Sequence, residues 1–582
     1  MKINVQHPNE RAKRFTFVKR NMSYILMAML LALLTICPLL VMLLASFQPA
    51  GFNPLALHEL TFSNYTNVFG SSDTYRLLLN TFIYAIGSMA LGMSIAVIMA
   101  WLVERTDMPF KKYIYVAIFI PMAIPGAIAA FGYTFLLNPT NGVINVIIRD
   151  LFNMSTNSGP LNFYSLGGMI FITGISYAPT MFIMLSSVIR NLDPTLEESA
   201  SASGAHKMGV MYYIVFPLLR PGLLSTFIYF VTLMIETLEI PLIIGFNAGF
   251  EVLSMRVFKL TGGGGQGQYP EYGLASAYGL IGLFIGVMLL LFYFYTTRRS
   301  NQYAVITGKG YKAKTNKLGK LKYAALSFFG LFFFLKLFLP VIVLFWFSLL
   351  PYMQAPSLEM LRLLSFDNYI ALLDSNRFIK AVMNTILMTI ISSLVCMFFA
   401  AFVSWMTVRG KGFLAKLLDL LAFVPHLIPA IVIALALLLT SARTPLYGTI
   451  WVLIVGYVIR YLPFAVRTMT SVLMQVSNEL EEAAYASGAS KWAAFHKVTL
   501  PIVFPAFMNG LVWVASHAMR DLTLPIVLIS TSNIVIGSLI YETWRNGREV
   551  ETAMIAVLLV AVLIFVVTPI QILLGRRMNR TK

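Results

Sequence analysis

The sequence predicts an all-α polytopic membrane protein of about twelve transmembrane helices, arranged as two tandem six-helix repeats in parallel orientation. Three observations predict this fold. The chain of 582 residues is 58% hydrophobic and only 12% charged, a balance that soluble domains of this size do not show. Apolar runs long enough to cross a bilayer recur along it. Residues of the first half of the chain also recur in the same order in the second half.

The apolar runs extend from Tyr24 to Leu574, and each has about 20 residues, the helical length that spans a hydrocarbon core. We expect helices because an isolated strand cannot satisfy its backbone groups in lipid. Both cysteines, Cys37 and Cys396, fall inside these runs, which favours buried thiols over a disulfide or a metal site. The runs centre near residues 34, 91, 125, 177, 233, 285, 336, 393, 427, 458, 516 and 563.

The net charge of +19 comes from basic residues that flank the apolar runs. A basic chain can bind nucleic acid, but the position of these charges indicates retention on the cytoplasmic side of a membrane. Twelve spans place both termini and the central linker on that side, so we expect cytoplasmic termini, a lipid bilayer as surroundings and no nucleic-acid partner. The basic residues are Lys2, Arg11, Lys13, Arg14, Lys19 and Arg20 in the N-terminal tail, Arg298, Arg299, Lys309, Lys312, Lys314, Lys317, Lys320 and Lys322 in the linker, and Arg576, Arg577, Arg580 and Lys582 at the C-terminus.

An internal repeat covers nearly the whole chain. Asn64 recurs as Asn368, 304 positions later, and from Tyr177, which recurs as Tyr461, the separation is 284. Because each half holds six spans, an even number, both halves enter the membrane in the same direction, and a pathway is expected between them. The sequence predicts a first half at residues 1–297, a basic cytoplasmic linker at 298–322 and a second half at 323–582.

The third and ninth spans each hold two prolines four positions apart, Pro121 with Pro125 and Pro425 with Pro429. This spacing places each pair on one helix face and predicts a kink, because proline removes a backbone donor. Paired kinks suit a gate. The alternative is that neighbouring helices simply tolerate these prolines, as is common in membrane proteins.

A polar segment separates the fourth and fifth spans of each half, at about 190–221 and about 474–503. Gly204 lies within the first segment and Gly488 at the corresponding place in the second. We expect each glycine to end a short helix in a left-handed turn. A second stretch then runs back toward the membrane and stops at Pro217 or Pro501. Each segment is thus predicted to form a rigid cytoplasmic elbow.

Both elbows resemble the coupling loop of type I ABC importer permeases, whose signature is Glu-Ala-Ala, three residues, Gly, nine residues, Ile, one residue and Leu-Pro. The departures are Ser199 and Phe216 in the first copy and Val498 in the second. In that family the loop docks on the ATPase subunit; the alternative is a helix pair that packs only on its own domain. The resemblance implies an ATPase-coupling surface formed by Glu198, Ala200, Gly204, Pro217, Glu482, Ala484, Gly488 and Pro501.

The resemblance also implies the fold of these permeases, a bacterial inner membrane location, two copies of an ABC ATPase subunit and a periplasmic solute-binding protein. One chain supplies both halves, so no homodimer is expected. The glycine-rich segments at 262–267 and 307–310 lack the spacing and the Lys-Ser/Thr ending of a phosphate-binding loop. We therefore expect a non-catalytic subunit without a cofactor, with ATP and Mg bound by the partner ATPase.

Charged residues inside spans are costly and point to function. The fifth span holds Glu236 and Glu239, and the eleventh holds His517, Arg520 and Asp521. These five residues form the candidate pathway. Glu236 corresponds to Arg520 in the repeat, so one interpretation is an ion pair between the halves. The other is a transient cation site at the two glutamates, since carboxylates are hard oxygen ligands. No firm metal site is predicted.

The fused halves, the segment Glu236-x-x-Glu239-x-Pro241 and the linker sequence at 304–311 resemble the ferric iron permeases over the whole chain. This resemblance implies ferric iron as the solute. Permeases of the same class for thiamine, phosphonate, polyamines or sulfate are alternatives. An ion-coupled carrier that uses Glu236, Glu239 and Asp521 as relays belongs to a different class, and the coupling loops argue against it.

Overall fold

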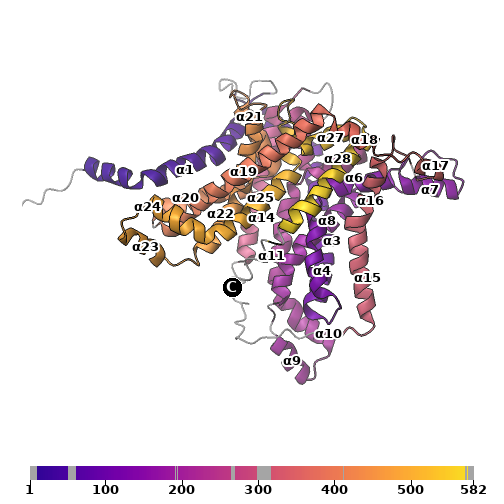
Figure 1. Cartoon of the computed structure of the whole chain (residues 1–582), viewed down its shortest axis with the longest axis horizontal. Helices are drawn as coiled ribbons and strands as arrows, with labels where there is room; N and C mark the ends of the chain where they lie inside the picture. Colours follow the sequence, from indigo (N-terminus) through magenta and orange to yellow (C-terminus); the bar gives the residue numbers. More distant parts are fainter. Residues whose placement is uncertain are drawn as a thin grey trace, which may run out of the picture.

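The computed structural model describes residues 10–49, 60–190, 192, 194–263, 269–297, 316–354, 356–410, 412–570 and 573. The predicted basic linker up to residue 315 and the basic residues at 576–582 lie outside this part of the chain. Within it, the long elements are helices that pack side by side (Figure 1).

Ten of the described helices are long and apolar enough to cross a membrane, and three further pairs of helices qualify only as bent spans. The first half contains α1 (Glu10–Ser46), α3 (Ser72–Arg105), α5 (Phe119–Ala123), α6 (Gly126–Leu137), α8 (Leu166–Arg190), α9 (Pro194–Ala202), α11 (Phe216–Ile235) and α14 (Tyr272–Thr297). The second half contains α16 (Leu339–Ser348), α19 (Asn376–Arg409), α20 (Phe413–Phe423), α21 (Ala430–Ser441), α22 (Ile450–Leu473), α23 (Glu479–Ala486), α25 (Leu500–Arg520), α27 (Ile536–Arg545) and α28 (Glu549–Val562).

The ten straight helices and two of the bent pairs correspond to the twelve predicted spans. The remaining bent pair, Pro241–Ala248 with Leu253–Gly263, was not predicted, because none of the twelve predicted spans is centred in this region. The pair is bent by 88°. The chain reverses there at Gly249, whose φ of 64° lies in the left-handed region that glycine adopts without steric cost.

The first span of each half crosses onto the other half. In the first half, α1 packs on α20 and α21 (Figure 1), and in the second half α16 packs on α6. Hydrogen bonds accompany both crossings, from Tyr24 Oη to the Met406 carbonyl at 3.3 Å and from Tyr133 Oη to the Leu335 carbonyl at 2.9 Å. The two halves therefore exchange elements along their contact, which we call the seam.

Both proline pairs break the helix, rather than kink it. The third span is bent by 79° and the ninth by 104°. Between each pair, one isoleucine is extended: Ile124 has φ −77° and ψ 119°, and Ile428 has φ −100° and ψ 119°. A residue that precedes proline is driven out of the helical region by contact with the ring. The prediction that each pair shares one helix face is therefore wrong, although the bends lie where they were expected.

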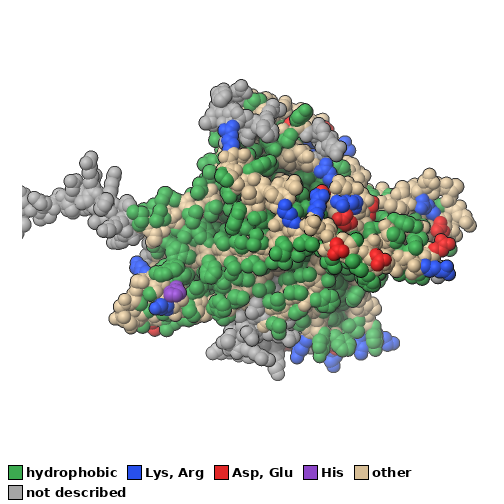
Figure 2. Space-filling model, turned by 45° about the horizontal axis from the view of Figure 1, so that its top comes forward, with side chains coloured by type: hydrophobic (Ala, Val, Ile, Leu, Met, Phe, Trp, Pro, Cys, Tyr) green, Lys and Arg blue, Asp and Glu red, His purple; other side chains and the backbone are tan. Residues whose placement is uncertain are grey.

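The surface of the helical body is suited to lipid. Figure 2 shows hydrophobic side chains over the broad middle of one face, while most charged side chains lie around its margins. Large apolar residues along the spans, such as Phe284 and Phe398, are more than half exposed. Such exposure is unfavourable in water and is expected where acyl chains cover the protein.

Candidate functional site

The two elbow helices lie at the surface. α9 and α23 project from the helical body at separate places (Figure 1). The signature carboxylates Glu198 and Glu482 are exposed, and Ala200 and Ala484 are half-buried. The surface that the sequence predicts for ATPase coupling is therefore accessible in both halves.

Glycine ends each elbow helix in the same way. Gly204 has φ 86° and Gly488 has φ 84°. The turn is closed by bonds from the Ala205 N–H to the Ala200 carbonyl and from the Ala489 N–H to the Ala484 carbonyl, both at 3.0 Å. A Cβ atom would meet no other atom within 4 Å at either glycine. The backbone conformation, and not a lack of space, is thus what favours glycine.

The predicted end of each elbow at a proline is wrong. In both halves the helix continues from the elbow into the fifth span, over Met211–Ile235 and Lys491–Arg520. A π-helical turn precedes Pro217 and another precedes Pro501, and each proline falls in the first turn of the α-helix that follows. Because each proline follows a π-helical turn, the helix passes through it without a break. The elbow is therefore continuous with a membrane-spanning helix.

A buried ion pair that the sequence analysis missed anchors each elbow. Arg105, at the end of α3, lies 3.4 Å from Glu197, and Arg409, at the end of α19, lies 3.0 Å from Glu481. The arginines correspond at the 304-residue separation and the glutamates at the 284-residue separation. A search of the repeat for charges that match in both halves would have found them. Each pair ties the elbow to the end of the second span of its own half.

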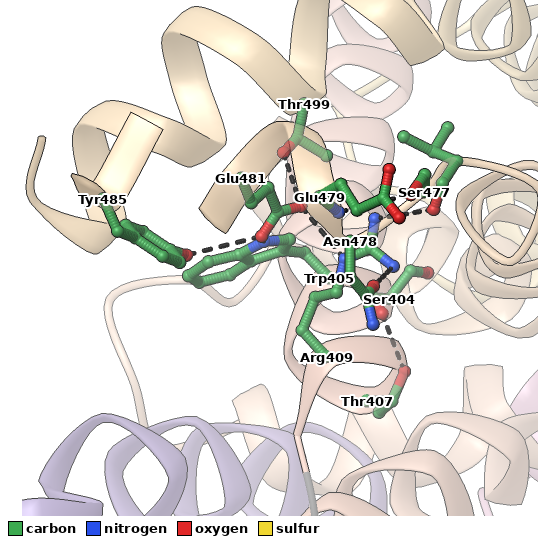
Figure 3. A network of polar contacts seen from close by, with 11 residues as sticks. Ser404, Trp405, Thr407, Arg409, Ser477, Asn478, Glu479, Glu481, Tyr485 and Thr499 are labelled. Atoms are coloured by element: carbon green, nitrogen blue, oxygen red, sulfur yellow. Dashed lines mark hydrogen bonds and ion pairs between the residues drawn. The ribbon is translucent and has the colours of Figure 1, made fainter. Parts of the chain in front are cut away.

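The second anchor is the more extensive one (Figure 3). The Glu481 carboxylate accepts hydrogen bonds from Thr499 Oγ1 at 2.7 Å, Trp405 Nε1 at 3.1 Å and Tyr485 Oη at 3.4 Å. Burial raises the pKa of Glu481, but the bonds from Thr499, Arg409 and Trp405 outweigh it, so that the net pKa is lowered. The carboxylate is thereby kept in its charged form.

The first anchor is built from different residues. Val215 stands where the second half has Thr499, and Ser201 stands where it has Tyr485. Arg105 instead donates to the carbonyls of Ile189 at 3.3 Å and Leu192 at 2.9 Å, at the end of α8. The two elbows are therefore attached at equivalent places by different sets of bonds.

At the seam, Arg520 does not pair with Glu236, so the predicted ion pair is absent. Arg520 donates to the Met122 carbonyl at 2.8 Å and lies 2.6 Å from His517 Nε2. Met122 is in the last turn of α5, and the break after it leaves its carbonyl without a helical donor. That carbonyl attracts the guanidinium, so the predicted residues Arg520 and His517 serve the broken span and not the opposite carboxylate.

A lysine that was not predicted reaches the same break. Lys336, fully buried in the first span of the second half, donates to the Ile124 carbonyl at 3.4 Å and to Ser176 Oγ at 3.0 Å. A single lysine inside a long apolar run was the available signal. Two cations from the second half thus satisfy carbonyls that the proline break in the first half exposes.

Two further predicted pathway residues, Asp521 and Glu239, are held in place by bonds at the same level. Asp521 pairs with Arg460 at 2.5 Å and caps the following turn by accepting from the Leu524 N–H at 3.1 Å. Glu239 accepts from the Leu522 N–H of the other half at 3.3 Å. Among the described residues, no three His, Cys, Asp or Glu side chains form a group that could hold a metal ion.

Comparison with known families identifies the chain. The model for the inner membrane component of binding-protein-dependent transport systems matches twice, over residues 92–302 and 393–580. The chain belongs to this family. Each match includes one elbow, and the permease is therefore a tandem of two such components in a multi-pass membrane protein.

Several curated relatives of the permease are named for ferric iron transport. The Fe(3+)-transport system permease protein FbpB 2 of Haemophilus influenzae is 24% identical over 82% of this chain and 85% of its own length. The ferric transport system permease protein FbpB of Actinobacillus pleuropneumoniae is 22% identical over 74% and 61%. The probable sulfate transport system permease protein cysT of Chlorella vulgaris is 28% identical over 32% and 76%.

Among solved structures, a bacterial alginate ABC transporter in complex with a pentasaccharide-bound periplasmic protein matches half of this permease. The identity is 18%, the match covers 50% of this chain and 99% of the other, and the TM-score is 0.38.

A cavity of about 850 Å³ lies at the opposite end of the permease from the second anchor. It is lined from α19 by Asn376, Arg377 and Lys380, whereas Arg409 of the anchor is at the other end of the same helix. Both halves contribute to its wall, the first through Phe258 and Tyr272. We call it the outer cavity, because the elbows are predicted to be cytoplasmic.

Proposed function

We propose that this permease forms the translocation pathway for ferric iron in an importer driven by ATP hydrolysis on two copies of a separate ATPase subunit. The observation that carries the proposal is the pair of exposed elbows, which occupy equivalent positions in the repeat and are each anchored to a spanning helix. The ferric transport relatives, which match over most of the chain, support the choice of solute.

The elbows offer a rigid path for force. Each is continuous with the fifth span of its half and is tied by an ion pair to the second span. With 34 residues, α19 is about 50 Å long at 1.5 Å per residue, so it joins the second elbow to the outer cavity. Movement of the elbows by closing ATPase subunits would then displace helices that meet at the seam.

The remaining roles follow from the same arrangement. One chain supplies both halves of the pathway, so a second copy is not needed. The chain acts as a non-catalytic subunit, and ATP and Mg bind to the ATPase partner. A periplasmic solute-binding protein delivers the solute to the outer cavity. Both termini and the linker face the cytoplasm of a bacterial inner membrane, in agreement with the position of the basic residues.

Transport by vesicles tests the proposal. Proteoliposomes that contain the permease and its ATPase, with the binding protein outside and ATP inside, should accumulate radioactive ferric iron. Vesicles without ATP, or with an ATPase variant that cannot hydrolyse it, should not. Uptake that continues without ATP and follows a proton or sodium gradient would instead identify an ion-coupled carrier.

The outer cavity favours a second candidate, the import of an oxyanion. Its lining includes Arg377, Lys380 and Arg545 but only one carboxylate, Glu542, which pairs with Arg377. A positive surface of this kind attracts anions. The same vesicles distinguish the two candidates when the binding protein is loaded with sulfate or phosphonate. Accumulation of the anion, without uptake of iron, would exclude ferric iron as the imported solute.

A further inference from the structure

Glu236 is an acid at the seam that forms no ion pair with a described residue, although the charge of Arg460 acts on it from a distance. It follows α11 directly, at the C-terminal end of the candidate span Met211–Ile235. The two arginines of the seam are engaged elsewhere, Arg520 with the Met122 carbonyl and Arg460 with Asp521. An acid without a partner at this depth is costly, which marks the position as functional.

The Glu236 side chain borders a void of about 10 Å³, enough for one water molecule or one ion. Around the void lie two phenols, Tyr229 and Tyr293, the hydroxyl of Thr232 and the imidazole of His426. The Tyr229 ring stacks on the His426 ring at 6.1 Å and lies 6.4 Å from the Tyr293 ring. Residues of both halves that carry oxygen or nitrogen donors therefore line a space of atomic size, together with apolar residues such as Leu233 and Leu427.

The repeat gives this void a counterpart, and the two differ in charge. Glu236 corresponds to Arg520, and His426 corresponds to Met122, so both places are contacts between the end of a fifth span and the break in the opposite third span. At the contact between Arg520 and Met122, the guanidinium closes the contact by bonding to the Met122 carbonyl. At the contact between Glu236 and His426, the carboxylate leaves the contact open. Only the open contact has the charge that suits a cation.

We propose that the void beside Glu236 is a transit site for a hard cation, with Glu236, Tyr229, Tyr293 and His426 as its ligands. The inference rests on the proposed function, in which that cation is ferric iron. Carboxylate and phenolate oxygens are hard ligands, and a tyrosine phenolate binds iron in some haem proteins. The site has one carboxylate, and the described part of the chain holds no group of three His, Cys, Asp or Glu, so binding there is weak. This suits a solute in transit, which must leave as easily as it enters.

Iron bound to phenolate absorbs visible light, which provides a direct test. The purified permease in lipid nanodiscs is titrated with ferric nitrilotriacetate. The absorption recorded is the charge-transfer band from phenolate to iron. We expect the band with the wild-type permease and its loss in a Tyr229→Phe, Tyr293→Phe double variant. Tyr84→Phe is the control, because Tyr84 is also a tyrosine of a spanning helix but lies in the core of the first half, bonded to Thr173.

Uptake provides the second measurement. Glu236→Gln should lower the rate of ferric iron uptake at least tenfold, while the ATPase activity stimulated by the binding protein is retained, which shows that the variant is folded and assembled. A permease that imports ferric iron without the band, or whose Glu236→Gln variant imports it normally, overturns the site and leaves the proposed function intact. A wild-type permease that imports no ferric iron overturns the proposed function and, with it, the transit site.

Discussion

At the scale of single residues, the anchors account for how an exposed elbow can be held rigidly. Glu481 is buried, whereas its neighbour Glu482 points to solvent. Two adjacent acids thus have different tasks, since one fixes the helix to the membrane domain and the other is free to meet a partner. The signature that the sequence displays most clearly, at Glu198 and Glu482, concerns the exposed acid, so the buried acid beside it was easily overlooked.

Glu481→Gln should loosen the second elbow. The amide cannot pair with Arg409, and removal of one partner of a buried pair costs about 3 kcal/mol because the other charge is left uncompensated. We expect faster hydrogen exchange over residues 479–499 and more ATP hydrolysed per solute imported. Glu482→Gln is the comparison: its exchange should match the wild-type permease, since Glu482 makes no contribution to the anchor. Equal exchange in both variants would contradict the anchor.

Gly488→Val should uncouple transport from ATP hydrolysis. At φ 84° a residue with a Cβ is strained by about 1–2 kcal/mol, and a β-branched residue by more, so the turn that ends α23 would rearrange. The measurement is the ratio of ATP hydrolysed to solute imported, which should rise. Gly209→Ala serves as the control, because Gly209 lies in a helix of the first elbow with a negative φ and open space around it. Normal coupling in Gly488→Val would refute the elbow as the transmitting element.

At the scale of elements, the break in the third span persists because cations of the other half satisfy its carbonyls. Lipid offers no donors, so an exposed carbonyl at this depth must be paired within the protein. Lys336 and Arg520 fulfil that need at Ile124 and Met122. The bend of one half therefore depends on contact with the other, as is expected of a structure that opens and closes when the halves move.

Lys336→Met tests this dependence. Methionine fills a similar volume but donates no hydrogen bond, so the Ile124 carbonyl loses its partner at a cost of about 1–3 kcal/mol. We expect a lower Tm for the permease in detergent, followed by loss of the monodisperse peak on size-exclusion chromatography. Lys322→Met removes an exposed cation from the start of the same span and should leave the Tm unchanged. Equal stability of the two variants would show that another donor satisfies the break.

Periodicity and composition predicted the spans well, because a stretch of about 20 apolar residues has few options in lipid. The details at prolines were harder to predict. Pro125 breaks its helix since the preceding Ile124 becomes extended, whereas Pro217 is absorbed by a π-helical turn at Met211–Val215. In the sequence, the two prolines look alike. Whether a proline breaks its helix depends on whether neighbouring helices supply donors for the exposed carbonyls, and that is a property of the assembled fold.

At the scale of the whole molecule, the repeat predicted two halves in the same orientation but not how they meet. The exchange of first spans, α1 onto α20 and α21 and α16 onto α6, is decided by side-chain packing between segments far apart in the chain. For the same reason, the sequence analysis paired Glu236 with Arg520: the repeat makes them equivalent, but equivalent residues of parallel halves need not touch. In the fold, each lies against the broken span of the opposite half.

The exchanged spans predict that the two halves hold together without a covalent link. If the chain is divided between residues 308 and 309 and the two parts are produced in the same cell, a tag on the first half should purify the second in equal amount, because α1 and α16 each bury apolar surface against the other half. The reassembled permease should also support ATP-dependent uptake. Either half-chain produced alone should be recovered in lower yield. In the first half, the carbonyls exposed by the broken span would lack the donors Lys336 and Arg520. In the second half, the broken span would face no partner helix. Independent recovery of both halves, without association, would contradict the exchange of spans and would show that the linker is what keeps the halves together.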